Sequence, residues 1–241
     1  MSIPSAHIEV PRRVRELAGR AALAPVWHNN IGGLTYRTDD GRFIKYGPLD
    51  AEANMRDEAE RMRWASRWTP VPEVIEQGED ATHEWLVTVA IAGESAVVAR
   101  WIAEPATAVR AVGEGLRALH DALPTGECAW SWGVPARIAN AEARGIRIPE
   151  ALHKAPAVDR LVVCHGDACV PNTLLDADGR WRAHVDLAAL GTADRWADIA
   201  VASMSTTWNY GPGWDEALIE AYGIEPDRER LAYYRDMWNA T

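Results

Sequence analysis

One stretch of the sequence concentrates residue types that suit phosphoryl transfer. It reads His165-Gly166-Asp167-Ala168-Cys169-Val170-Pro171-Asn172, and Asp186 follows on a predicted hairpin. In this D-x-x-x-x-N spacing with a later Asp, Asp167 is expected to face an attacking hydroxyl and accept its proton. Asn172 and Asp186 offer hard oxygen ligands, which suit Mg²⁺. The alternative interpretation of the octapeptide alone is a polar turn capped by Asp and Asn.

Lys45 and Glu58 form a second candidate pair, suited to holding nucleotide phosphates. Lys45 lies in the apolar strand Phe43-Ile44-Lys45-Tyr46, from which a lysine can reach α- and β-phosphates. Glu58 borders the apolar face of a predicted helix over 51–68, three residues after Met55. A carboxylate on such a face is costly unless it is paired, so Lys45 is its expected partner. In the alternative, both side chains are simply solvated.

Two glycine patterns invite comparison with nucleotide-binding loops. Gly32 and Gly33 precede the first predicted hairpin, and adjacent glycines let backbone N–H groups approach phosphates closely. An ordinary turn is the alternative interpretation there. The segment Gly113-Glu114-Gly115-Leu116-Arg117-Ala118 matches the dinucleotide fingerprint in letters only. It lies within a predicted amphipathic helix and follows no strand, so we do not interpret it as a dinucleotide site.

Composition narrows the class of protein. The chain has 241 residues, 48% of them hydrophobic, enough for one domain or two small lobes. Its 25 Lys and Arg against 35 Asp and Glu give a net charge of −10. This balance argues against nucleic acid as a partner and suits a cationic ligand. The sequence contains no apolar run of about 20 residues, which argues against a membrane span. With three cysteines and no apolar start, it is expected in the cytoplasm.

The order of predicted elements indicates an α+β protein of two lobes. Residues 1–90 are expected to form a sheet-rich N-terminal lobe with one helix, and residues 91–241 a mainly helical C-terminal lobe. The turn Asp39-Asp40-Gly41 predicts a hairpin. Predicted strands are 34–38, 42–46, 74–76, 85–90, 160–164, 174–176 and 181–186. Predicted helices are 51–68, one after Pro105, 194–204, 214–222 and 227–238.

The chain resembles the aminoglycoside phosphotransferase family, most closely its 3′- and 3″-O-phosphotransferases. The resemblance rests on V-V-C-H-G-D-A-C-V-P-N over 162–172 and H-V-D-L-A-A-L-G-T-A-D-R-W-A-D-I-A over 184–200. It continues more loosely over nearly all of the chain. It implies a protein-kinase-like fold, with an antiparallel-sheet N-terminal lobe and a mainly helical C-terminal lobe.

The resemblance also implies roles for individual residues. Asp167 resembles the catalytic base, and Asn172 and Asp186 the Mg²⁺ ligands. Lys45 resembles the ATP lysine, with Glu58 as its helix partner. The remaining implied positions are the nucleotide-loop residues Gly32 and Gly33, the adenine-contacting backbone of Val89 and Ile91, and the supporting residues His165, Asp194, Arg195 and Asp198.

Two departures from the family concern the acceptor. A helical insertion between Cys128 and Val162 is expected to be shorter here by about thirty residues, with 136–144 as its first helix. Members of the 3′ group often end in an acidic pair followed by aromatic residues, whereas this chain ends Asp236-Met237-Trp238-Asn239-Ala240-Thr241. The carboxylates expected to face a cationic acceptor are Glu142, Glu150, Asp159 and Asp236.

These patterns together predict an ATP- and Mg²⁺-dependent O-phosphotransferase acting on a small molecule. The resemblance implies an aminoglycoside antibiotic of the kanamycin/neomycin or streptomycin type as the acceptor, phosphorylated at either its 3′ or its 3″ hydroxyl. One alternative is a kinase for another hydroxylated metabolite, such as a sugar, a choline-like amine or another antibiotic. The other is a nucleotide-binding pseudokinase without catalysis. A protein kinase is disfavoured because the A-P-E motif of an activation segment is absent from the sequence.

Overall fold

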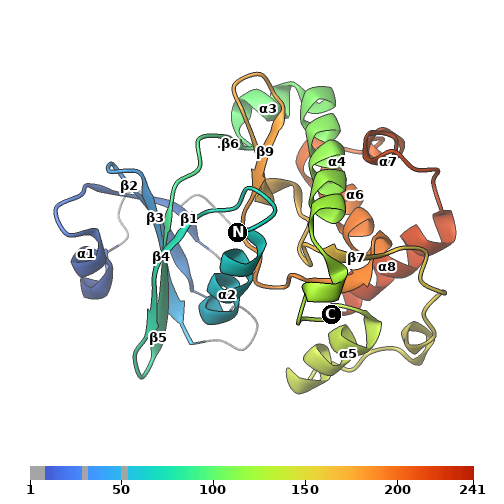
Figure 1. Cartoon of the computed structure of the whole chain (residues 1–241), viewed down its shortest axis with the longest axis horizontal. Coiled ribbons are helices and arrows are strands. Elements are labelled where there is room, and N and C mark those ends of the chain that lie inside the picture. The colour runs from blue at the N-terminus through green and yellow to red at the C-terminus, as the bar shows by residue number, and fades with distance from the viewer. Residues whose placement is uncertain (1–8, 29–31, 50–53) are drawn as a thin grey trace. The chain divides into compact units, whose positions relative to one another are not determined.

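The structure, a computed structural model, describes residues 9–28, 32–49 and 54–241. The chain divides into two compact units, residues 1–67 with 71–91 and residues 68–70 with 92–241. An antiparallel sheet forms the first unit and helices make up most of the second (Figure 1). The α+β organisation predicted from the sequence is therefore confirmed.

A five-stranded antiparallel sheet is the framework of the first unit. Its strands run in the order β1-β2-β3-β5-β4. Gly41, with φ of 83°, closes the β2–β3 hairpin at the predicted turn, because only glycine adopts such a φ without strain. The strands are β1 (Leu23–His28), β2 (Leu34–Thr38), β3 (Arg42–Pro48), β4 (Val74–Glu79) and β5 (His83–Val89).

The two faces of this sheet pack against different helices. Tyr36, Ile44 and Val87 face one side and form a buried core with Val14 of α1 (Arg12–Ala18). Since side chains alternate along a strand, the neighbouring Lys45 points to the other side, where α2 (Met55–Ala65) packs (Figure 1).

Short strands in the second unit carry the segments that hold the predicted catalytic residues. β7 (Leu161–Cys164) pairs antiparallel with β10 (Gly191–Asp194) and leads directly into His165. A second sheet has the order β6-β8-β9, formed by β6 (Glu94–Ser95), β8 (Thr173–Leu175) and β9 (Trp181–His184). β8 begins just after Asn172, and β9 ends just before Val185 and Asp186.

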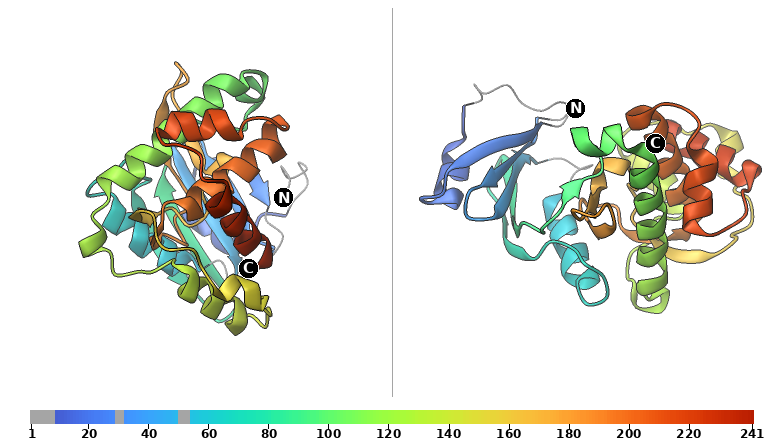
Figure 2. Two further views of the ribbon diagram at one scale, coloured as in Figure 1. Left: turned by 90° about the vertical axis from the view of Figure 1, so that its right-hand side faces the viewer. Right: turned by 90° about the horizontal axis from the view of Figure 1, so that it is seen from above.

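Helices form the bulk of the second unit. The long helix α4 packs against α6 and α7, and α6 also packs against α8 (Figure 2). The α-helices are α3 (Ala99–Ala103), α4 (Pro105–Ala122), α5 (Val134–Ala143), α6 (Trp196–Tyr210), α7 (Asp215–Tyr222) and α8 (Arg228–Ala240). Short 3₁₀ turns are η1 (Thr125–Glu127), η2 (Glu150–His153) and η3 (Val170–Asn172). Among the described residues, no helix combines the length and apolar character needed to cross a membrane.

The glycines of the false dinucleotide pattern serve helix packing. Both lie inside α4, as the sequence predicts. A Cβ on Gly113 would lie 2.7 Å from the backbone oxygen of Leu218, and one on Gly115 would lie 2.4 Å from the ring of Trp181. The missing side chains therefore let α7 and β9 approach α4 closely.

Several element boundaries differ from the sequence predictions. α2 ends at Ala65, before the expected Trp68, and the predicted start at 51–53 lies outside the described residues. Asp194, expected to open a helix, is instead the last residue of β10, and the helix α6 begins at Trp196. Helix α1 and strand β1 were not predicted.

Candidate active site

Asp167 is half-buried, and its two carboxylate oxygens have different surroundings. Oδ2 accepts a hydrogen bond of 3.1 Å from the side-chain amide of Asn172. Oδ1 is buried and has no hydrogen-bond partner within the part of the chain that the structure describes. A buried carboxylate oxygen without a donor is costly, so this atom is suited to accept a hydrogen bond from a hydroxyl group that binds there.

Asn172 links the loop formed by residues 165–172, which carries Asp167, to the segment that carries Asp186. Its amide nitrogen also donates to the backbone oxygen of Asp167 at 3.0 Å, which leaves its own Oδ1 able to act as a ligand. Its backbone oxygen accepts from the N–H of Val185 at 3.0 Å. The oxygen-bearing side chains of Asn172 and Asp186 therefore come from directly joined segments.

Asp186 has an unusual backbone conformation. Its φ is 62°, and it is the one described residue other than glycine with a positive φ. Asp tolerates this left-handed region better than most residues, although at some energetic cost. Such strained positions are common at functional sites, and here the strain falls on a predicted metal ligand.

Gly166 allows the two segments to meet. Its φ is 86°, and a Cβ placed on it would lie 2.1 Å from the backbone oxygen of Ala189. Any other residue would therefore face both an unfavourable φ and a collision with the backbone. Glycine at this position lets the loop before Asp167 lie directly against the segment after Asp186.

His165 adds a further link between the same segments. Its Nε2 lies 2.9 Å from the backbone oxygen of Val185, and the N–H of Asp167 lies 3.3 Å from its Nδ1. These partners require a proton on Nε2 and a lone pair on Nδ1. His165 therefore links the loop that carries Asp167 to the segment that carries Asp186.

Helix α6 anchors the loop at both ends. Asp198 accepts hydrogen bonds from the backbone N–H groups of His165, at 2.6 Å, and Gly166, at 3.0 Å. Ser205 accepts one from the N–H of Val170 at 2.9 Å. Asp198 and Ser205 are two turns apart on one helix, so they lie on the same face. Asp198 was predicted from the sequence as a supporting residue and Ser205 was not, although the helical spacing of Ser205 from Asp198 was a usable signal.

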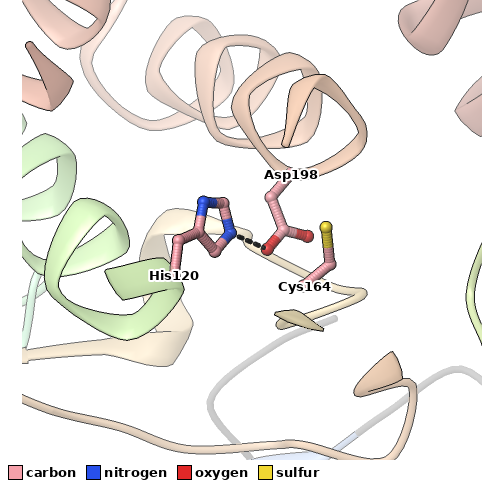
Figure 3. A group of neighbouring side chains, drawn as sticks. All are labelled: His120, Cys164 and Asp198. Atoms are coloured by element: carbon pink, nitrogen blue, oxygen red, sulfur yellow. Dashed lines mark hydrogen bonds and ion pairs between the residues drawn. The ribbon is translucent and has the colours of Figure 1, made fainter. Parts of the chain in front are cut away.

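Asp198 belongs to a buried group of three neighbouring side chains, His120, Cys164 and Asp198 (Figure 3). His120 Nε2 lies 2.9 Å from Asp198 Oδ2, and its Nδ1 lies 2.8 Å from the hydroxyl of Tyr222. Burial acts to raise the pKa of Asp198, but the hydrogen bond and charge of His120 outweigh it, so this pKa is lowered. Asp198 is therefore a carboxylate that accepts from several donors at once.

The same group is not suited to be a metal centre. The ligand atoms of His120, Cys164 and Asp198 lie within 4.8 Å of one another. However, burial and the nearby charge of Asp198 raise the pKa of the Cys164 thiol well above its usual value. A protonated thiol is a poor ligand, and the oxygens of Asp198 already accept backbone N–H groups. We therefore interpret the group as a hydrogen-bonded support.

Asp194 and Arg195 make their side-chain contacts with segments other than the loop that carries Asp167. The Asp194 carboxylate accepts from the N–H groups of Trp196, at 3.1 Å, and Asp159, at 2.9 Å. Arg195 forms an ion pair with Asp159 at 2.6 Å. Of the three residues predicted to brace the loop, only Asp198 uses its side chain on the loop backbone in the described contacts.

Cys169 lies beside the candidate base. Burial raises the pKa of its thiol, and the negative charge of Asp167 acts in the same direction. It therefore stays protonated at neutral pH and is no nucleophile. Sequence analysis assigned it no role.

The predicted ion pair is present in the first unit. Lys45 Nζ lies 2.7 Å from Glu58 Oε1. Glu58 is 5% exposed and lies on the buried face of α2 with Met55, Ala59 and Met62. The pairing predicted from spacing is confirmed, and the lysine remains partly exposed.

Other residues expected to contact a nucleotide also lie in the first unit. Gly32 is exposed, with open space where a Cβ would lie, whereas Gly33 is buried. Residues 29–31 of the same loop lie outside the described residues. The N–H of Val89 donates to the backbone oxygen of Glu73 at 2.9 Å, and Ile91 is half-buried two residues beyond.

The expected acceptor carboxylates lie in the second unit and differ in their surroundings. Glu142, Glu150 and Asp236 are exposed. Asp159 instead accepts from Arg195 Nε at 2.7 Å and from the indole of Trp196 at 3.0 Å. Its oxygens are thus already engaged within the chain.

Comparison with known proteins decides the family. The model of the Phosphotransferase enzyme family matches residues 32–234, most of the chain. The chain belongs to this family. The matched region of this phosphotransferase includes Lys45, Glu58, Asp167, Asn172 and Asp186, together with the supporting residues Asp198 and Ser205.

The relatives of this phosphotransferase include enzymes named for aminoglycosides. It is 34% identical to an aminoglycoside 3′-phosphotransferase from Streptomyces fradiae, over 87% of this chain and 92% of the relative. It is 32% identical to a streptomycin 3″-kinase from Streptomyces griseus, over 84% and 86%. The first alignment spans 250 positions, so parts of that relative have no counterpart in this phosphotransferase.

A solved structure supports the fold. The aminoglycoside phosphotransferase APH(3'')-Id from Streptomyces rimosus, in complex with ADP and streptomycin, matches with a TM-score of 0.70 and 26% identity, over 93% of this chain and 94% of that one. The phosphotransferase therefore has the protein-kinase-like fold predicted from its sequence. It is an enzyme, a kinase that resembles the aminoglycoside phosphotransferases.

Proposed function

We propose that this enzyme transfers the γ-phosphoryl group of ATP to a hydroxyl group of an aminoglycoside, with Mg²⁺ as cofactor. The observation that carries the proposal is the state of Asp167. Its Oδ1 is buried and lacks a hydrogen-bond donor in the described chain, while Asn172 holds its Oδ2 at 3.1 Å. A carboxylate that is held through one oxygen, and whose other oxygen lacks a donor, is suited to accept a hydrogen bond from an incoming hydroxyl group.

In this proposal Asp167 acts as the base. The acceptor hydroxyl donates its proton to Oδ1, and the freed oxygen attacks the γ-phosphorus as the bond to the leaving ADP oxygen breaks. The transition state is largely dissociative, so positioning of the hydroxyl matters more than basicity. The contacts of His165, Asp198 and Ser205 with the loop backbone would supply that positioning.

The residues present fit Mg²⁺. Asn172 contributes an amide oxygen whose orientation is fixed, because its NH₂ group is bound to Asp167. Asp186 contributes a carboxylate held in a defined backbone conformation. Oxygen ligands of this kind, with water and phosphate oxygens, satisfy the preferences of Mg²⁺. When bound, Mg²⁺ neutralises charge on the phosphates.

Lys45 and Glu58 would serve the nucleotide. A lysine held 2.7 Å from a buried glutamate is fixed in place and can bind α- and β-phosphate oxygens. Gly32 and Gly33 would cover the phosphates with backbone N–H groups. The N–H of Val89 donates to Glu73. We therefore assign the adenine contact to the backbone oxygen of Val89 and to the backbone groups of Ile91. The ADP complex of the Streptomyces rimosus relative supports nucleotide binding.

The names of the relatives support an aminoglycoside as acceptor. One acts at a 3′ position, one is a streptomycin 3″-kinase, and one was solved with streptomycin. Glu142, Glu150 and Asp236 are exposed carboxylates that could meet ammonium groups. We do not assign Asp159 to the acceptor, because Arg195 and Trp196 occupy it. As an ATP-using enzyme, the protein is proposed to act in the cytoplasm.

A screen of ATP consumption tests this proposal. Kanamycin, neomycin, streptomycin and hygromycin are each incubated with the enzyme, ATP and Mg²⁺, and ADP release is recorded. We expect turnover with at least one drug and none with Asp167→Asn. Phosphorus–proton correlation by NMR then identifies the phosphorylated position as 3′ or 3″. Nucleotide binding without turnover on any acceptor would instead identify a pseudokinase.

A kinase for another metabolite is the second candidate, favoured by the charge near the end of α8. Arg137 of α5 is 2% exposed and donates to the Thr241 hydroxyl at 2.9 Å, while Arg144 donates to the Thr241 backbone oxygen at 2.6 Å. Burial lowers the pKa of Arg137. Arginines here reduce the negative potential offered to a polycation and would suit a less charged acceptor. Adding amino sugars and choline to the same screen separates the two functions.

A further inference from the structure

A buried carboxylate on β5 lies at the start of the helix that carries Glu58. Glu84 is 2% exposed, and its Oε2 accepts a hydrogen bond of 2.8 Å from the backbone N–H of Met55, the first residue of α2. Burying a carboxylate is costly unless donors compensate it. The helix N-terminus provides such compensation, since its first N–H groups lack partners within the helix and carry partial positive charge.

Strand register places Glu84 and Lys45 on the same face of the sheet. β3 and β5 pair Lys45 with Leu86 and Gly47 with Glu84. Residues two apart on a strand face the same side, so Glu84 is a diagonal neighbour of Lys45. Its direct cross-strand partner, Gly47, has no side chain to compete with it for space on that face.

The sheet therefore holds α2 by two polar contacts on one face. Lys45 holds Glu58 in the first turn at 2.7 Å, and Glu84 holds the backbone of Met55 at the start of that turn at 2.8 Å. Asn54 separately caps the helix by accepting from the N–H of Asp57 at 3.0 Å. A helix fixed by its first turn cannot slide or rotate freely, so the position of Glu58 relative to Lys45 depends on Glu84.

We propose that Glu84 is a positioning residue for the nucleotide site, acting through Glu58 and Lys45. This inference rests on the proposed role of Lys45 in binding nucleotide phosphates. Glu84 itself is not expected to touch the nucleotide. Its effect should appear as a change in nucleotide affinity that requires Glu58 to be present.

Three substitutions of Glu84 separate the effect of its side-chain length from the effect of its charge. Glu84→Gln keeps an oxygen that can accept from the N–H of Met55, whereas Glu84→Asp keeps the charge but shortens the side chain. Glu84→Ala removes both. The matched control is Glu79→Ala, which removes an exposed ion pair of 3.0 Å between the same sheet and Arg56 of the same helix. Exposed pairs contribute little, so this variant should bind nucleotide as the wild type does.

The measurement is ADP affinity with Mg²⁺ by calorimetry, at a temperature well below unfolding for every variant. We expect Glu84→Ala and Glu84→Asp to weaken binding about three- to thirtyfold, and Glu84→Gln to recover most of it. In a Glu58→Ala background, Glu84→Ala should weaken binding no further.

Three outcomes would overturn the inference. One is wild-type affinity in Glu84→Asp and Glu84→Ala with only a lower free energy of unfolding, which indicates a purely structural role. Another is an additive loss in the double variant, which shows that Glu84 acts independently of Glu58. The third, should Glu84→Ala not fold, is wild-type affinity in Glu84→Asp. Failure of the wild-type protein to bind ADP would instead refute the proposed function.

Discussion

The side-chain amide of Asn172 lies 3.1 Å from Oδ2 of Asp167 and 3.0 Å from its backbone oxygen. One residue thereby fixes both the carboxylate and the loop that presents it, while its own oxygen stays available. The predicted metal ligand and the predicted base are thus coupled directly, so a change at either residue should disturb both functions.

Asn172→Ala should lower kcat by at least about 100-fold, because the base loses its anchor and the metal loses a ligand. Steady-state kinetics over a Mg²⁺ titration measure both effects. Asn239→Ala, an exposed change on α8, serves as the control and should leave the kinetics unchanged. A variant with normal kcat and normal Mg²⁺ dependence would contradict both roles.

Asp186 allows charge and backbone conformation to be tested separately. Asp186→Asn keeps a residue that tolerates the observed φ of 62°, whereas Asp186→Ala does not. Both should reduce Mg²⁺-dependent ATP affinity at least about tenfold. Only Asp186→Ala should also lose about 1–2 kcal/mol of unfolding free energy. Titration with and without Mg²⁺, together with urea unfolding, checks this, and an unchanged Mg²⁺ dependence would refute the metal assignment.

Gly166→Ala should be far more damaging than the same change at another glycine with a similar positive φ. Gly211 has a φ of 89° and open space around its Cβ position, whereas Gly166 faces Ala189 at 2.1 Å. Gly211→Ala should cost about 1–3 kcal/mol of unfolding free energy from conformation alone, because Gly211 combines this φ with a ψ of 175°. Gly166→Ala should cost more and abolish turnover, because the segments of Asp167 and Asp186 must separate. Urea unfolding and turnover assays of both variants measure this, and equal losses in the two would show that the close contact is unimportant.

Stability should fall as the pH drops below about 6.5. Burial lowers the pKa of His184 well below its ordinary value near 6.5. Below that pH the unfolded chain takes up a proton that the folded chain does not. The free energy of unfolding should therefore decrease by about 1.4 kcal/mol per pH unit.

Urea unfolding between pH 7 and pH 5 measures this slope. His184→Gln removes the titrating group and should flatten the curve, whereas His153→Gln, an exposed change, should leave it unchanged. A slope in His184→Gln equal to that of the wild type would assign the pH dependence to other groups.

Local patterns in the sequence predicted much of the candidate site. The helical spacing of Glu58 with Met55 predicted a buried carboxylate, and its contact with Lys45 is found at 2.7 Å. The turn Asp39-Asp40-Gly41 predicted the β2–β3 hairpin. Such features depend on residues close in the chain, whose side-chain periodicity and φ preferences act whatever the rest of the molecule does.

Other features depended on partners far along the chain. Asp194 was expected in a helix but lies in β10, because it pairs with Leu161 of β7. Ser205 lies just after the end of a predicted helix, His120 within another, and Glu84 just before a predicted strand, and none of the three was predicted to contribute to the site. Their roles follow from contacts with Val170, Asp198 and Met55, respectively.

The sequence by itself predicted the candidate chemistry: a candidate base, two candidate oxygen ligands, and a lysine with its glutamate, each recognisable from residue type and short spacing. Only the tertiary structure decided how these groups are held. A buried polar side chain has several possible donors and acceptors, and which of them it meets depends on how distant segments pack. Asp198 and Glu84 illustrate this, since each is a buried carboxylate compensated by backbone N–H groups of another segment.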